Sequence, residues 1–167
     1  MKFTCLTLFL FGALCSCVPQ TRTSQLVPVV KSSANTGQPV LVRITGSRNQ
    51  APLEGLEIEA EDFKEALETS VVDSGLFAGI GGGAYELEAT IVSSRQPAAV
   101  FSVTTEFVIA YTLTKGGSIV WKDTIRSSHL TSTAESSIAE FRDRMSAEGA
   151  MRENIRVAIG GMSARLQ

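Results

Sequence analysis

The sequence predicts an α+β fold, a two-layer sandwich in which an antiparallel sheet of about four strands carries two helices on one face. Three stretches between residues 84 and 126 alternate apolar and polar side chains, the pattern of strands covered on one face only. Two other stretches, 61–74 and 132–162, repeat apolar side chains every three or four residues, as amphipathic helices do. With one further strand before the first helix, the predicted order is β-α-β-β-β-α.

Four segments have the composition of strands. Residues 39–46 (PVLVRITG) are rich in β-branched side chains, and residues 84–93 and 101–114 alternate over longer distances. Residues 115–118 (KGGS) predict a hairpin turn, and the alternation resumes over residues 119–126. In the two longest strands the polar side is mostly threonine, serine and glutamate, so this face of the sheet is expected to be wet or available to a partner.

The first helix is predicted over residues 61–74. Its apolar residues Phe63, Leu67 and Val71 recur every fourth position, and acidic residues occupy its first turns, where they suit the positive end of the helix dipole. Gly75 is a suitable stop.

The second helix is predicted from Ser132, because Ser132 and Glu135 have the spacing of a capping box. Two apolar stripes follow, and they are out of phase around residues 148–149. A bend or a rotated face is therefore expected there. The stripes consist of Ile138, Phe141 and Met145, and of Met151, Ile155, Ala158 and Met162.

The amino terminus has the anatomy of a secretory signal peptide, with Lys2 ahead of an apolar run from Phe3 to Leu14. Residues 14–17 (LCSC) resemble the bacterial lipobox, which implies removal of residues 1–16 and acylation of Cys17 by a diacylglycerol and a third fatty acyl chain such as palmitate. Several acyl chains hold a protein stably on a membrane. The alternative is an ordinary cleaved signal peptide in which the cysteines occur by chance.

All three cysteines, Cys5, Cys15 and Cys17, lie in this region, so the expected mature chain has no free thiol and no disulfide. Removal of Lys2 with the leader changes the net charge from −2 to −3. No basic excess indicates nucleic acid as a partner.

Residues 17–38 are rich in Ser, Thr, Gln and Pro, and predict a flexible tether between the lipid and a periplasmic domain of residues 39–167. The alternative is that residues 26–30 (LVPVV) pair as an edge strand.

No catalytic centre, cofactor site or metal site is predicted. The glycines of residues 79–83 (GIGGG) follow a helix and precede a strand, the reverse of a phosphate-binding loop, so a flexible connection is expected. His129 has no second His or Cys to complete a zinc site, and no nucleophile elbow surrounds a serine. An envelope enzyme that uses Glu106 or Asp123 near His129 is kept as an alternative.

The chain resembles a family of small proteobacterial lipoproteins over residues 63–162. The matching motifs include residues 63–67 (FKEAL), 85–89 (YELEA), 119–121 (IVW) and, most distinctively, 147–155 (AEGAMRENI). The order of elements is also similar to that of the lipopolysaccharide-assembly lipoprotein LptE and of the auxiliary lipoproteins of lipid-transport ABC systems. The resemblance implies a periplasm-facing domain on a lipid anchor.

The sequence therefore favours a non-enzymatic lipoprotein of the cell envelope that binds a protein partner or an envelope component in outer-membrane assembly or transport. Val18 after Cys17 favours the outer membrane under the sorting rule of enteric lipoproteins, in which an Asp at this position retains the protein in the inner membrane. The expected contact surface is either the open sheet face or the exposed side of the last helix, with Arg144, Arg152 and Arg156. A small ligand-binding module is the other alternative.

Overall fold

The computed structural model describes residues 22–46, 58–97 and 101–167. The expected signal peptide, residues 1–16, and the expected lipid site, Cys17, lie outside the described residues. The strands are β1 (Pro39–Gly46), β2 (Gly79–Ile80), β3 (Tyr85–Arg95), β4 (Ser102–Lys115) and β5 (Ser118–Ser132). The helices are α1 (Thr23–Leu26), α2 (Ala60–Asp73) and α3 (Ala139–Arg165).

The α+β class is confirmed, but the sheet is mixed and has five strands, in the order β2-β1-β3-β4-β5. The expectation of an antiparallel sheet of about four strands is wrong in detail, because β1 pairs in parallel with both β2 and β3. Parallel neighbours need a crossover, and α2 is the helix between β1 and β3. β3, β4 and β5 form an antiparallel meander.

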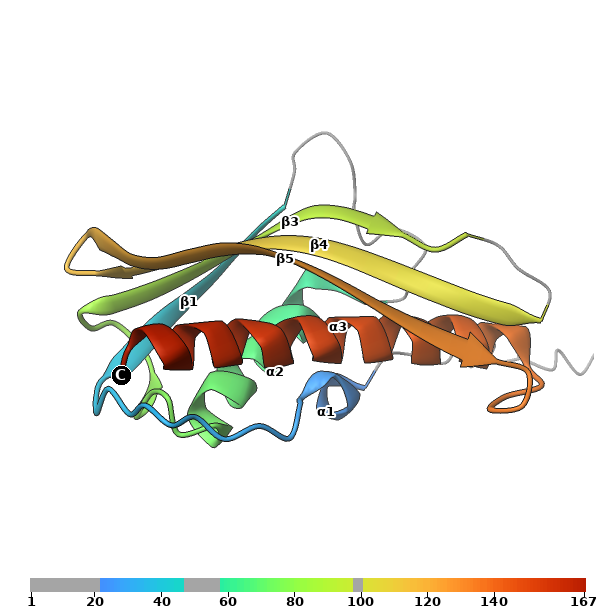
Figure 1. Cartoon of the computed structure of the whole chain (residues 1–167), viewed down its shortest axis with the longest axis horizontal. Helices are drawn as coiled ribbons and strands as arrows, with labels where there is room; N and C mark the ends of the chain where they lie inside the picture. The colour runs from blue at the N-terminus through green and yellow to red at the C-terminus, as the bar shows by residue number, and fades with distance from the viewer. Residues whose placement is uncertain (1–21, 47–57, 98–100) are drawn as a thin grey trace, which may run out of the picture.

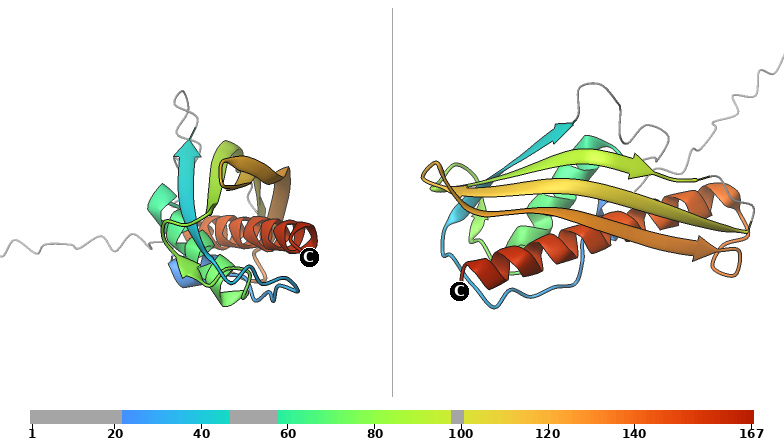
Figure 2. Two further views of the ribbon diagram at one scale, coloured as in Figure 1. Left: turned by 90° about the vertical axis from the view of Figure 1, so that its left-hand side faces the viewer. Right: turned by 45° about the horizontal axis from the view of Figure 1, so that its top comes forward.

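The helices share one face of the sheet, and the two views in Figure 2 show the opposite face bare of helices (Figures 1 and 2). Inward side chains of β3 and β4, such as Leu87, Ile109 and Leu113, are fully buried against this helical layer. The outward residues of β4 are only partly covered, in agreement with the expected polar face.

Residues 22–38 pack against the helical layer and do not form the expected tether over this range. We call them the strap. α1 lies against α2 and α3, and Leu26 is fully buried. The Ser32 N–H donates to the Ser74 carbonyl (2.8 Å), and the Ser163 hydroxyl accepts from the Ser33 N–H (3.0 Å). No residue from 26 to 30 belongs to a strand, so the alternative of an edge strand is also not observed.

α3 is one uninterrupted helix of 27 residues, and it begins at Ala139 instead of Ser132. One of the two contacts of a capping box forms, since the Glu135 carboxylate accepts from the Ser132 N–H (2.8 Å); the Ser132 hydroxyl donates to the same carboxylate (3.1 Å). It closes a turn at the end of β5 instead of the first turn of the helix. None of the helices in the described ranges is long and apolar enough to span a membrane.

Candidate interaction site at the junction of the strap, β5 and α3

α3 is held on β5 at two positions where an aromatic ring lies against a helical glycine. A Cβ atom on Gly149 would lie 2.3 Å from Cδ2 of His129, and a Cβ atom on Gly161 would lie 3.0 Å from Cζ2 of Trp121. No other residue type leaves room for the His129 ring at position 149. The two contacts fix where the helix lies along the strand.

A buried hydrogen-bond network lies between these two contacts. The Tyr111 hydroxyl donates to Oδ1 of Asn154 (2.8 Å), and Nδ2 of Asn154 donates to the Ile125 carbonyl (3.1 Å) and to the Ser127 hydroxyl (2.9 Å). Burial raises the pKa of the Tyr111 hydroxyl well above its ordinary value, so it stays a proton donor. Every hydrogen-bonding atom of the Asn154 side chain is thus satisfied by the sheet.

The Ser146 hydroxyl joins α3 to the backbones of both β4 and β5. It accepts from the Thr105 N–H (2.8 Å) and lies 2.7 Å from the His129 carbonyl and 3.2 Å from the Val103 carbonyl. His129 is therefore fixed through its backbone as well as its ring. His129 is also one of the residues that line a surface pocket.

This first pocket, of about 520 Å³, opens between the strap, the end of β5 and α3. Pro28 and Val29 line its strap side, whereas His129, Arg152 and Arg156 line the opposite side. Val29 is fully exposed to solvent. The pocket thus combines an apolar wall with an imidazole and two guanidinium groups.

The two arginines of this pocket already have partners within the chain. Arg152 donates to the Gln25 carbonyl (2.8 Å) and so fastens α1 to α3. Arg156 forms two bonds with Glu153, at 2.7 and 2.6 Å, which lower the pKa of that carboxyl and raise the pKa of the guanidinium. A ligand would meet a balanced ion pair at Arg156 and Glu153, beside the guanidinium of Arg152, whose partner is a neutral carbonyl.

Arg144 lies apart from the other two arginines that the sequence suggested. Its side chain is only 19 % exposed, pairs with Glu148 (3.6 Å) and lies over the Phe141 ring. Glu148 is itself almost buried, and its carboxylate lies 3.5 Å from the Arg22 N–H at the start of the strap. Burial raises the pKa of Glu148, and the nearby N–H and arginines only partly oppose this effect.

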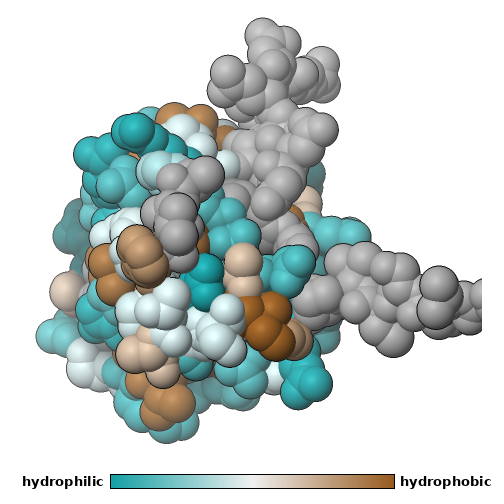
Figure 3. Space-filling view, turned by 90° about the vertical axis from the view of Figure 1, so that its right-hand side faces the viewer, coloured by the Kyte–Doolittle hydropathy of each residue, from teal (hydrophilic) through white to brown (hydrophobic). Residues whose placement is uncertain are grey.

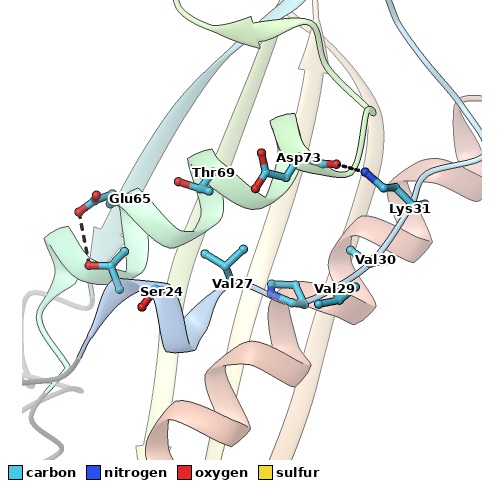
Figure 4. A pocket seen from close by; sticks show the side chains of 10 residues that line it. Ser24, Val27, Val29, Val30, Lys31, Glu65, Thr69 and Asp73 are labelled. Carbon is cyan, nitrogen blue, oxygen red and sulfur yellow. Dashed lines mark hydrogen bonds between the residues drawn. The ribbon is translucent and has the colours of Figure 1, made fainter.

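A second pocket, of about 610 Å³, lies on the other side of Pro28 and Val29, between the strap and α2. Figure 4 shows Glu65 at one end and the contact of Lys31 with the backbone of Asp73 (2.8 Å) at the other. Val27 and Val30 give the strap side an apolar surface. The two pockets form one surface on both sides of the strap.

The residues weighed for catalysis are not brought together. Glu106 pairs in register with Ser128, so it projects from the opposite face of the sheet to His129, one position further on. Asp123 is six residues from His129 along β5, about 20 Å in an extended strand. Within the described ranges, no group of three His, Cys, Asp or Glu residues could hold a metal ion.

Sequence reasoning missed the strap, although it supplies the apolar wall of both pockets. The signal was present: residues 26–30 hold four apolar side chains around one proline. Their spacing follows neither the helical nor the strand period, because the strap runs across the helices without regular structure of its own. Periodicity alone cannot identify such a segment.

No family model matches the chain, and no curated protein matches it. Solved structures with low sequence identity do share its fold. The crystal structure of protein XCC0632 from Xanthomonas campestris, described under the family model DUF330, is 14 % identical, with a TM-score of 0.57. The match covers 83 % of this chain and 94 % of that one.

Two further structures are similar to a comparable degree. PelC from Paraburkholderia phytofirmans, described as a dodecamer, is 14 % identical over 80 % of this chain and 92 % of its own, with a TM-score of 0.52. A protein described as a putative lipoprotein from Caulobacter crescentus is 17 % identical over 74 % of this chain and 89 % of its own, with a TM-score of 0.50. Likenesses at this level of identity show a common fold.

Proposed function

We propose that this protein is a lipid-anchored, non-enzymatic lipoprotein of the bacterial cell envelope, attached through Cys17 to the outer membrane on its periplasmic face. Its domain binds a protein partner or an envelope component in outer-membrane assembly or transport. The observation that carries the proposal is the lipobox-like sequence of residues 14–17 at the end of a signal-peptide pattern. The shared fold with the putative lipoprotein from Caulobacter crescentus supports it.

The surface on both sides of the strap is the site that fits a partner best. It combines the fully exposed Val29 with the polar groups of His129, Arg152 and Arg156. An apolar centre within a polar rim is the usual composition of a protein contact. Arg144, which pairs with Glu148 away from this surface, is left out of the proposed contact.

The anchor is tested by mass spectrometry of the amino terminus after extraction from membranes. We expect a chain that begins at Cys17 and carries three acyl chains, and a Cys17→Ala variant that leaves the membrane fraction. A native chain that is unacylated and freely soluble would overturn the proposal.

The partner surface is tested by photo-crosslinking in intact cells. A photoreactive residue at Val29 is compared with one at Val92, which is 48 % exposed on β3 and distant from the strap. We expect a specific crosslink from position 29 only, and its mass distinguishes a foreign partner from a second copy, the kind of assembly that the PelC dodecamer illustrates. The binding role fails if position 29 captures nothing and deletion of the gene leaves the envelope barrier unchanged.

A further inference from the structure

Large apolar side chains are exposed at one end of the molecule, the end where β4 begins, β5 ends and α3 begins. We call this end the tip and define it by Phe101, Leu130 and Ile138. Their exposed fractions are 76 %, 55 % and 48 %. Figure 3 views the molecule from this end and shows apolar patches among polar ones. Side chains of this kind lose contact with water when a partner covers them, and their exposure together suggests a contact.

The chain connections bring these three residues to one end of the molecule, where Leu130 lies on the face of the sheet opposite α3. Phe101 directly precedes β4, and its carbonyl accepts from the Thr133 N–H (2.9 Å) just beyond β5. Leu130 pairs with Thr104 two residues before the end of β5. Ile138 is the N-cap residue of α3. The tip is therefore built from the ends of three packed elements.

The strap begins close to the same end. The Arg22 N–H lies 3.5 Å from the Glu148 carboxylate, and Glu148 is ten residues into α3 from Ile138, about 15 Å of helical rise. The other end of α3, at Arg165, is about 26 Å beyond Glu148. The described chain thus starts in the half of the molecule that carries the tip.

Only four residues separate Arg22 from Cys17, and the five residue-to-residue steps between them span at most about 18 Å in an extended chain. A lipid on Cys17 would therefore hold the start of the strap within this distance of the membrane surface. Because this attachment lies nearer to the tip than to the other end of α3, the tip is the end that the anchor brings toward the lipid.

We infer that the tip is a membrane-contacting surface, in which Phe101, Leu130 and Ile138 enter the interfacial region of the leaflet that holds the anchor. The inference rests on the proposed acylation of Cys17. Apolar side chains at the interface add to the lipid anchor and also orient the domain. The exposed tip residues Glu135 and Glu140 are acidic, so the surface suits zwitterionic lipid and gains nothing from anionic lipid.

The test uses the mature acylated protein in vesicles of phosphatidylethanolamine and phosphatidylcholine. Since the only cysteine of that chain is acylated, a Leu130→Cys variant provides a single free thiol for a bimane label. The matched control is Ile119→Cys, at the opposite end of the same strand and 63 % exposed. We expect the label at 130 to shift its emission to shorter wavelength and to be quenched by lipids with brominated acyl chains, whereas the label at 119 responds as in water.

Three outcomes would overturn the inference, and they are distinguishable. If the protein does not float with the vesicles and its amino terminus carries no lipid, the anchor proposal fails and the inference with it. If the acylated protein floats but the labels at 130 and 119 respond alike, only the membrane contact fails. If the label at 130 is shielded without vesicles and more so at higher protein concentration, a second copy covers the tip.

Discussion

Two glycines of α3 differ in their surroundings, since Gly149 lies against the His129 ring and Gly160 faces open space. Alanine substitutions at the two positions test this difference. Gly149→Ala should destabilise the protein by about 1–3 kcal/mol, because the new methyl group would overlap the His129 ring. Gly160→Ala is the matched control. Nothing lies within 4 Å of its Cβ position, so it should stabilise the helix by about 0.5–1 kcal/mol.

Urea denaturation of both glycine variants gives the two free energies of unfolding. Combining Gly149→Ala with His129→Ala should recover part of the loss, since the second change removes the ring. Equal effects at positions 149 and 160 would show that the ring contact does not constrain the helix.

The Asn154 network predicts unequal costs for its members. Tyr111→Phe leaves one buried acceptor without a donor and should lower the free energy of unfolding by about 1–2 kcal/mol. Asn154→Ala leaves three groups of the sheet without a partner and should cost about 2–4 kcal/mol. In urea denaturation the double variant should lose less than the sum, and strict additivity would contradict a shared network.

Glu148 predicts a pH dependence of stability with a definite sign. Its pKa is raised in the folded protein because burial disfavours the carboxylate. The protein therefore gains stability from this group when it is protonated, below its ordinary pKa, and loses that gain as the pH rises through the raised pKa. Glu148→Gln should be more stable than the native chain at pH 7, and the difference should shrink toward pH 4. A variant that is less stable at pH 7 would show that the contacts with Arg144 and the Arg22 N–H outweigh burial.

At the scale of elements, the strap packs as part of the hydrophobic core. Substituting one buried and one exposed apolar residue of the strap tests this packing. Leu26→Ala should cost about 2–4 kcal/mol, because Leu26, the last residue of α1, is fully buried. Val29→Ala, at the fully exposed position, should change the stability by less than about 0.5 kcal/mol. Hydrogen exchange should also accelerate at the Ser32 and Ser33 amides in the Leu26 variant. Equal, small effects would indicate that the strap is loosely attached.

The individual strands and α2 were predictable because their patterns are regular. β1 was predicted with its observed bounds, and α2 differs from its prediction by one residue at each end. β5 was expected only to residue 126 but runs to Ser132, since its second half replaces apolar residues with Ser127 and Thr131, which are buried under α3. Alternation of apolar and polar side chains identifies a strand but not the strands that pair with it. The parallel pairing of β1 with β3 could therefore not be predicted.

Of the bend or rotated face expected in α3, the rotated apolar face fits this single helix. Residues such as Met151, Ile155 and Ile159 are fully buried around a wide part of the helix, because the sheet covers one side and α1 and α2 contact another. Ile138 and Phe141, from the first stripe, remain partly exposed near the tip. Two sets of neighbours explain a change of apolar face in a straight helix. The distinctive motif of residues 147–155 coincides with this contact, through its small residues and Asn154.

At the scale of the whole molecule, the candidate site was predictable only in part. Arg152 and Arg156 do share a pocket, whereas Arg144 lies elsewhere and pairs with Glu148. The strap residues Val27 and Val29 could not be assigned, because their role depends on a path across two helices that are distant in the sequence. Surfaces formed by segments far apart in the chain need a three-dimensional structure to be recognised.

The short distance between the proposed anchor and the strap predicts a response to chain length. Inserting 12 Gly and Ser residues after Val18 adds a flexible segment with a root-mean-square span of about 19 Å. The acylated variant should still float with vesicles, but its bimane at position 130 should be quenched less by brominated lipid. Unchanged quenching would mean that the tip finds the membrane by its own affinity.

The rings of His129 and Trp121 against Gly149 and Gly161 have a mechanical consequence. If α3 slid by one turn toward either end, Met145 or Glu153 would replace Gly149 beneath the imidazole, and Val157 or Arg165 would replace Gly161 beneath the indole. None of these side chains fits the space that a glycine leaves. The helix cannot act as a piston, and binding at one end is not relayed to the other by translation.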